Sequence, residues 1–377
     1  SQEFSWIKIN GCYEISLSVL LCSFLTPPLF LKISLVSCIW TMDELERISH
    51  YLMIIVGILM FILGIIGNLL NICIFFRWSH PTNVSKDKSN LSTKSNGSLY
   101  LLVSSTSNLI IILYPLLTRI IFDGFQYSIT EDSSFVLCKF RYYILHTFDL
   151  ISLTCICMAT FDRYLLTSRQ VRIRHLSPMK KRTEQMILLI IILNIVHSIP
   201  IGFYFDVSKS GDCLIESHVY FYYYLVVFQI ILHSLMPIVF LSIFGTLTYR
   251  HLKKLKHTGL SRSDKHLSHM LLLMSVAIVL SSIPYCIEYI SYIFVPFQHS
   301  QPRSFLYLYH VITSILFYTN PVTSFYIFYI STPNFRKHVK KIVLCRKSPH
   351  DQQADSLTTL ILCHNSCEQK KYDEEYV

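Results

Sequence analysis

The chain has 377 residues, of which 52% are hydrophobic and only 15% are charged, and its formal net charge is +10. Soluble domains carry roughly 25% charged residues, so this composition argues against a soluble globular protein and favours a membrane protein. The twelve cysteines form no CxxC pair and no Cys/His cluster at metal-binding spacing. Neither a metal site nor a dense disulfide framework is therefore predicted.

Seven apolar segments follow one another along the chain, each near or above the roughly 20 residues that a membrane-spanning helix needs. We place them at residues 50–76, 99–122, 140–166, 185–205, 219–248, 267–296 and 305–330. The connecting segments are polar and mostly short, and no internal repeat is visible, which disfavours a transporter built from inverted repeats. The sequence predicts an all-α membrane protein, a seven-transmembrane helix bundle.

The flanking segments differ from the bundle. Residues 1–41 form a hydrophobic leader, interrupted by Pro27-Pro28, whose status stays open between upstream sequence, a signal peptide and an extra helix. Residues 42–345 form the predicted seven-transmembrane domain. Residues 346–377 are polar and acidic near their end, which is typical of a disordered tail.

Positive charge predicts the orientation of the bundle. Most of the 33 lysines and arginines lie in residues 77–98, 163–182, 250–265 and 336–347, the connections after spans one, three, five and seven. The positive-inside rule places these segments and the C-terminus in the cytoplasm, with the N-terminus outside. The net positive charge then reflects topology and contact with anionic lipid, so nucleic acid is not an expected partner.

The third span carries two features at its ends. Cys138 precedes the triplet Asp162-Arg163-Tyr164 by about 25 residues, which at 1.5 Å per residue spans about 37 Å, so the two features lie at opposite membrane faces. An arginine at a membrane edge is costly unless it has a partner or a role. The carboxylate of Asp162 is the nearest candidate partner.

Seven spans, an outer Cys138 and an inner Asp162-Arg163-Tyr164 together resemble the rhodopsin-like (class A) G-protein-coupled receptors. Further residues match that family once per span and in order, although a proline or asparagine alone is equally a helix kink or an interhelical hydrogen-bonding residue. These residues are Asn68 after Gly67, Pro237, Pro284, and Asn320 with Pro321. Phe335-Arg336-Lys337 opens what resembles the short amphipathic helix that follows the last span in this family.

The resemblance implies a plasma-membrane receptor that binds an extracellular ligand and activates a heterotrimeric G protein, without a cofactor. It implies a disulfide between Cys138 and Cys213. It also implies that Asp264 pairs with Arg163 in the resting state, and that agonist binding swings span six about Pro284 and frees Arg163.

Among the departures from the family pattern that bear on activation, three concern spans two, six and seven. Asn108 replaces an aspartate that helps to hold sodium, so no sodium site is predicted. Ser282 occupies the position of an aromatic residue two before the span-six proline. Ser324 replaces the tyrosine of the family's Asn-Pro-x-x-Tyr motif.

The ligand-binding pocket is expected among spans three, five, six and seven. Receptors for amines carry an aspartate where this chain has Leu145, so an amine would lack its usual counter-ion. The candidate pocket residues are Leu145, His146, Asp149, Glu288 and Tyr292, each of which could equally be a packing residue. Acids in the predicted outer loops favour a peptide ligand, and within the family the chain resembles invertebrate peptide receptors.

A further expectation comes from a single residue. Cys345 follows the predicted amphipathic helix and suits S-palmitoylation.

The alternative function is a transporter or channel that uses Asp149, His197, His233 and Glu288 as a relay. The sequence holds no Ser-His-Asp arrangement or phosphate-binding loop, so an enzyme is not expected.

Overall fold

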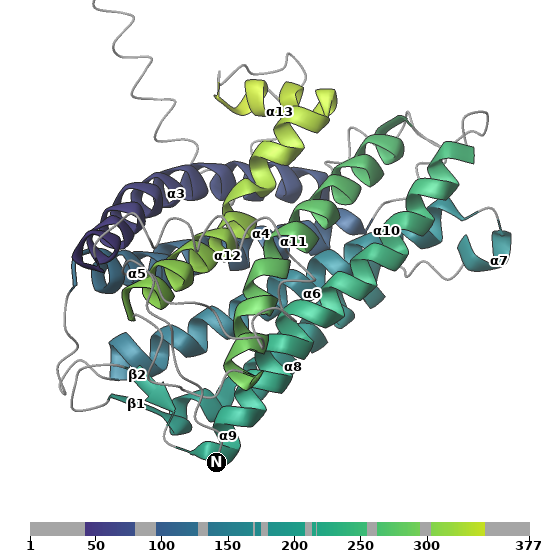
Figure 1. Ribbon diagram of the computed structural model, residues 1–377. Coiled ribbons are helices and arrows are strands. Elements are labelled where there is room, and N and C mark those ends of the chain that lie inside the picture. The colour runs from purple at the N-terminus through teal and green to yellow at the C-terminus, as the bar shows by residue number, and fades with distance from the viewer. Residues whose placement is uncertain are drawn as a thin grey trace, which may run out of the picture.

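The computed structural model describes residues 42–79, 96–126, 135–168, 170–174, 180–207, 213–215, 217–254, 262–294 and 303–343. Within these ranges, seven helices are long and apolar enough to cross a membrane. They lie side by side as a tilted bundle (Figure 1). The prediction of an all-α, seven-transmembrane fold is confirmed.

Several spans are built from more than one helical element. Span one is α3 (Met42–Ser79), and span two runs through α4 (Gly97–Ile111), η2 (Ile112–Leu116), α5 (Leu117–Arg119) and η3 (Ile120–Gly124). Span three joins η5 (Phe135–Phe140) to α6 (Arg141–Thr167), and span four is α8 (Lys180–Tyr204). Span five comprises α9 (His218–Tyr223), η6 (Tyr224–Leu235) and α10 (Met236–Lys254). Span six is α11 (Arg262–Phe294), and span seven is α12 (Arg303–Ser331).

Short elements mark the two ends of the bundle (Figure 1). Strands β1 (Phe205–Val207) and β2 (Cys213–Ile215) pair in antiparallel register, with Val207 opposite Cys213. The end of the bundle that carries β1 and β2 is called the hairpin end below. The opposite end, here the α13 end, carries α7 (Val171–Arg174) and α13 (Pro333–Val343).

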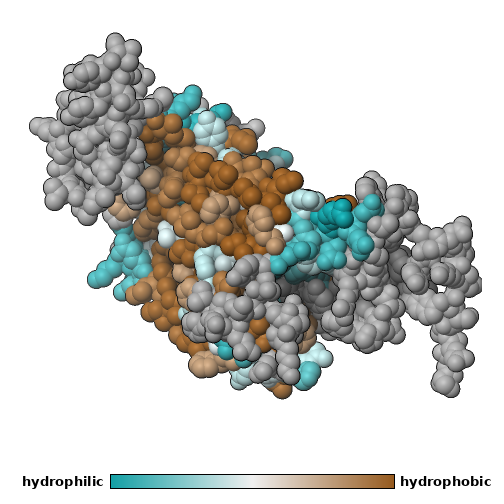
Figure 2. Space-filling model, turned by 90° about the vertical axis from the view of Figure 1, so that its left-hand side faces the viewer, coloured by the Kyte–Doolittle hydropathy of each residue, from teal (hydrophilic) through white to brown (hydrophobic). Residues whose placement is uncertain are grey.

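Helix α6 is the central helix of the bundle. In the most apolar stretch of span three, 67% of the residues are buried within the protein, whereas in α8 the share is 22%. The outward faces of the other spans carry large apolar side chains, such as Ile55, Leu188 and Leu280. The face of the molecule shown in Figure 2 is broadly hydrophobic, which suits contact with lipid chains rather than water.

Span one approaches span seven closely because α3 carries glycine at the contact. A Cβ atom added to Gly67 would lie 2.9 Å from the Cβ of Phe325 on α12, too close for any side chain. Small residues at such contacts let membrane helices pack backbone to backbone. The neighbouring Asn68 is thereby brought within hydrogen-bonding distance of span seven.

Span five contains a long π-helical segment, η6, that ends just before Pro237. Proline has no backbone N–H and clashes with the preceding turn, so the ordinary α-helical pattern is disturbed there. The hydroxyl of Ser234 donates to the carbonyl of Gln229, five residues earlier, at 3.0 Å. This contact follows the i→i+5 spacing of the π-helix.

Helix α13 packs its apolar side against the ends of spans one and seven. Phe335 and Val339 are buried, whereas Arg336, Lys337 and Lys340 are exposed. The ring of Phe335 lies 6.1 Å from that of Phe75 on α3 and 5.9 Å from that of Phe328 on α12. The predicted amphipathic helix after the last span is present, with basic residues on its exposed side.

Candidate functional site

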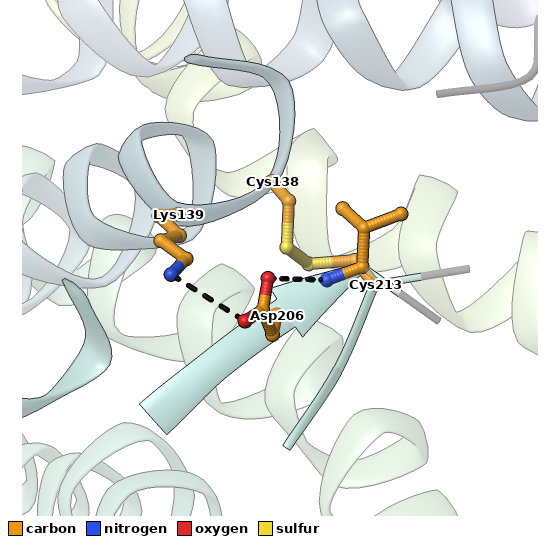
Figure 3. The surroundings of a disulfide bond; sticks show 5 residues. Cys138, Lys139, Asp206 and Cys213 are labelled. Carbon is orange, nitrogen blue, oxygen red and sulfur yellow. Dashed lines mark hydrogen bonds and ion pairs between the residues drawn. A yellow bond between two sulfur atoms is a disulfide. The ribbon is translucent and has the colours of Figure 1, made fainter. Parts of the chain in front are cut away.

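A disulfide ties span three to the hairpin. Cys138, in η5, is bonded to Cys213 in β2, with their Cα atoms 5.7 Å apart. The ammonium of Lys139 lies 3.8 Å from the carboxylate of Asp206 in β1 (Figure 3), so a second, weaker contact joins the same two segments. The hairpin is therefore held across the end of the bundle where the candidate pocket residues lie.

A chain of hydrogen bonds runs through the candidate pocket from span six to span three. The hydroxyl of Tyr285 on α11 donates to Gln229 at 3.0 Å, and the amide of Gln229 donates to the hydroxyl of Tyr224 at 2.6 Å. Tyr224 bonds to Nε2 of His146 at 2.6 Å. His146 Nδ1 then lies 3.3 Å from Nε2 of His233.

The chain ends at a buried acid. Nδ1 of His233 lies 2.6 Å from a carboxylate oxygen of Asp149 on α6, and both side chains are less than 5% exposed. Buried polar groups are stable only when they are hydrogen-bonded. Two predicted pocket residues, His146 and Asp149, are thus brought together and satisfied by span five.

Glu288 belongs to a second polar network, between spans six, seven and two. One of its carboxylate oxygens lies 2.6 Å from Nδ1 of His310 on α12, and the other accepts the hydroxyl of Thr313. Arg119 in span two bonds to Nε2 of His310, and it also pairs with Asp123. The side chain of Glu288 is 1% exposed.

The other predicted pocket residues are placed less centrally. Leu145 is half-buried and packs against the apolar core between spans one, two and seven. Tyr292 lies in α11, but its side chain is outside the described residues. Ser282 and Pro284 are half-buried within α11.

The four residues of the predicted relay fall into different surroundings. Asp149 pairs with His233, whereas Glu288 pairs with His310. The ring of His197 on α8 stacks on Phe228 with 4.3 Å between centroids. Each of the two acids is thus matched with a histidine of a neighbouring span.

Polar residues near the middle of the bundle join spans one, two, three and seven. The amide of Asn68 donates to the backbone oxygens of Gly64 and Pro321, at 2.9 Å each. Ser152 on α6 donates to the side chain of Asn108 at 2.7 Å. Asn320 is half-buried and Pro237 is buried in span five. Their role in activation stays a prediction.

Ser324 has a partner of its own. The amide of Asn71 on α3 donates to its hydroxyl at 3.2 Å. The tyrosine nearest to the family position, Tyr326, donates its hydroxyl to the backbone oxygen of Leu63 at 3.0 Å. Both contacts attach the α13-end half of span seven to span one.

The triplet of span three lies at the α13 end. Asp162 and Arg163 are 2% and 1% exposed, and Tyr164 is half-buried. The ring of Tyr164 stacks on His251 at the end of span five, with centroids 5.6 Å apart. Asp264 lies in the first turn of α11, and its side chain is outside the described residues, as is Cys345. The Arg163–Asp264 pair and the lipidation of Cys345 stay predictions.

Several residues of the two networks were not expected from the sequence. An arginine or histidine within an apolar span is a usable signal, because a polar group there needs a partner. Arg119 and His310 carry that signal. Gln229 and Tyr224 carry a weaker signal, because neutral polar side chains are ordinary interhelical hydrogen-bonding residues in membrane helices.

The sequence also matches a known protein family. Residues 93–324, more than half of the chain, match the family model described as "7 transmembrane receptor (rhodopsin family)". No curated protein matches the chain.

Proposed function

The chain belongs to the rhodopsin family of seven-transmembrane receptors, and from that premise we propose that it binds an extracellular peptide and activates a heterotrimeric G protein. The single observation that carries the signalling part is the burial of Arg163 at the α13 end of the central helix, where it is 1% exposed. A buried cation is retained at a cost. A switch role accounts for that cost better than packing does.

The orientation follows from charge. The segments that leave the bundle at the α13 end carry most of the lysines and arginines, so this end faces the cytoplasm and the hairpin end faces outward. The exposed basic residues of α13 then lie against anionic lipid. The disulfide lies outside the cell, where such bonds persist.

A peptide fits the hairpin end better than a small amine. Leu145 stands where amine receptors carry an acid, and both acids deeper in the bundle, Asp149 and Glu288, are already matched with histidines. Other acids of the predicted outer loops are candidates to recognise a ligand, namely Glu131, Asp132, Asp212 and Glu216, whereas Asp206 already pairs with Lys139. A ligand long enough to contact several loops at once, and basic in character, suits this arrangement.

The proposed mechanism is a two-state movement of span six. In the closed state Arg163 is restrained by Asp162 and by Asp264 at the start of α11. Agonist binding swings α11 about Pro284 and frees Arg163 to contact the G protein.

Basal nucleotide exchange tests this mechanism without a known ligand. With a co-expressed promiscuous G protein, Asp264→Asn should raise exchange, because a restraint worth about 1–3 kcal/mol shifts a two-state population by several-fold to roughly a hundredfold. Adding Arg163→Ala should abolish that gain while leaving the surface level intact. Arg172→Ala, an exposed arginine of α7, is the matched control and should not change exchange.

Two outcomes would contradict the proposed mechanism or the proposed function. If Arg163→Ala signals normally in the Asp264→Asn background, Arg163 has no switch role and the proposed mechanism is wrong. An ion flux that depends on Asp149, together with no nucleotide exchange, would instead favour the transporter.

A further inference from the structure

His310 lies between two groups of opposite charge on different spans. Its Nδ1 is 2.6 Å from the carboxylate of Glu288 on span six, and its Nε2 bonds to the guanidinium of Arg119 on span two. Arg119 is itself held by Asp123 and by the hydroxyl of Ser314. One imidazole therefore connects spans two, six and seven.

The chemistry of these groups fixes the hydrogens of His310. A guanidinium has only donors and is not deprotonated in proteins, so Nε2 of His310 must accept. A neutral imidazole carries a single N–H, which must then be at Nδ1, where it donates to Glu288. The three residues leave only one hydrogen arrangement.

A second proton on the imidazole is incompatible with that arrangement. An imidazolium carries N–H on both nitrogens, so Nε2 could no longer accept from Arg119, and two cations would face each other. The bond to Glu288 would be kept and strengthened by the added charge. Protonation therefore breaks the contact with span two while retaining the contact with span six.

We propose that His310 is a proton-binding site, at which extracellular acid breaks the His310–Arg119 contact between spans seven and two, while Arg119 keeps its bond to Ser314, and thereby shifts the receptor between its conformations. The second half of this statement rests on the proposed function and orientation. The side chain of His310 is 32% exposed, so a proton can reach it, whereas Glu288 is buried. Histidine is the side chain that ordinarily changes charge between about pH 5 and 8.

Among the histidines of the described residues at this end of the bundle, His310 contacts both an acid and an arginine. His50 on α3 also lies at the hairpin end, but its Nδ1 is 2.5 Å from the backbone oxygen of Asp123, and its nearest acid, Glu46, is 3.9 Å away. The titratable and charged groups of the packed elements are Glu46, His50, Arg119, Asp123, Glu288 and Tyr307. His50 is therefore a matched control.

Imidazole nitrogen NMR tests the site directly. The full chain, purified in lipid nanodiscs with nitrogen-15 histidine, is titrated from about pH 8 to about pH 5.5, and His310→Asn assigns the signal. We expect a protonated Nδ1 and a bare Nε2 at the upper pH, and protonation of both nitrogens at the lower pH. A proton on Nε2 at the upper pH, or no titration, overturns the proposal.

Signalling tests the consequence. Acidification of the medium from about pH 7.5 to about pH 6 should raise basal nucleotide exchange by roughly fivefold, a typical allosteric coupling. His310→Asn, which stays neutral, should abolish the response, and His50→Gln should retain it. An equal response in His310→Asn, or its loss in His50→Gln alone, overturns the proposal. If no variant shows exchange at any pH, the proposed function fails, and the NMR titration still decides the proton site.

Discussion

Asp149 and His233 meet inside the membrane domain with side chains 4% and 1% exposed. The two residues come from spans three and five and are 84 positions apart in the chain. Removing either takes from its partner a hydrogen bond that the surrounding medium cannot replace, although His233 keeps its contact with His146. The free energy of a single substitution at this pair is thus dominated by the residue that remains.

A double-mutant cycle measures this coupling. Asp149→Ala or His233→Ala should each destabilise the receptor by about 1–3 kcal/mol, because a buried group loses its hydrogen bond. The double variant should be less destabilised than the sum of the two. Thermal unfolding midpoints of the purified protein give the comparison.

The exposed pair Lys180–Glu184 is the control for that cycle. Its atoms are 3.7 Å apart, and the side chains are 33% and 54% exposed, so its coupling should be close to zero. Additive losses at Asp149 and His233 would show that the buried contact contributes nothing beyond the control.

A different result is expected for the disulfide, because removing either cysteine breaks the same bond. Cys138→Ser and Cys213→Ser should lower surface expression and the unfolding midpoint by similar amounts, consistent with the roughly 2–4 kcal/mol that a cross-link typically contributes. The double variant should be no worse than either single variant. Cys286→Ser, a half-buried cysteine outside the disulfide, is the control. Additive losses would contradict the prediction.

At the scale of elements, the helix after the last span was predicted from the family resemblance, and the seven spans were predicted from hydropathy. Hydropathy did not predict that η2, η3, η5 and η6 are π-helical, because hydrogen-bond spacing leaves little mark on composition. The candidate residues His146, Asp149 and Glu288 were predicted as a group. His233 was also named, as part of a possible relay, but His310 was not, and neither pairing was predicted, because pairing depends on how remote spans rotate against each other.

Helix α13 bears on the lipidation of Cys345, which lies two residues beyond its described end at Val343. The basic exposed side of α13 suits a position on anionic lipid, which would bring a following cysteine to the membrane surface. Cells fed a palmitate analogue should label the receptor, and Cys345→Ser should remove most of the label. Cys363→Ser, farther along the tail, should not, and an unlabelled receptor would contradict the prediction.

At the scale of the whole molecule, the first of the seven spans found among the described residues begins at Met42. Its helix, α3, carries acidic residues in the first turn, Asp43 and Glu44, which interact favourably with the helix N-terminus. The orientation follows from the basic connection after span one, which the positive-inside rule places in the cytoplasm.

A chain that starts at Met42 should therefore reach the cell surface with its N-terminus outside. An epitope tag at the new N-terminus, stained on intact and on permeabilised cells, measures this, with the 377-residue chain as the control. Retention inside the cell, or a tag visible only after permeabilisation, would mean that the leader takes part in setting the topology.

The π-helix η6 matters to anyone who transfers a position from another receptor onto this one by counting from Pro237. A turn with i→i+5 bonds takes up about one more residue than an α-helical turn. An offset of one residue rotates a side chain by about 100° around the helix axis. A stabilising substitution or fluorescent label carried over by counting alone would therefore point at lipid where the interior was intended. Alignments through Tyr224–Leu235 are better anchored on the buried contacts of Tyr224 and His233 than on the proline.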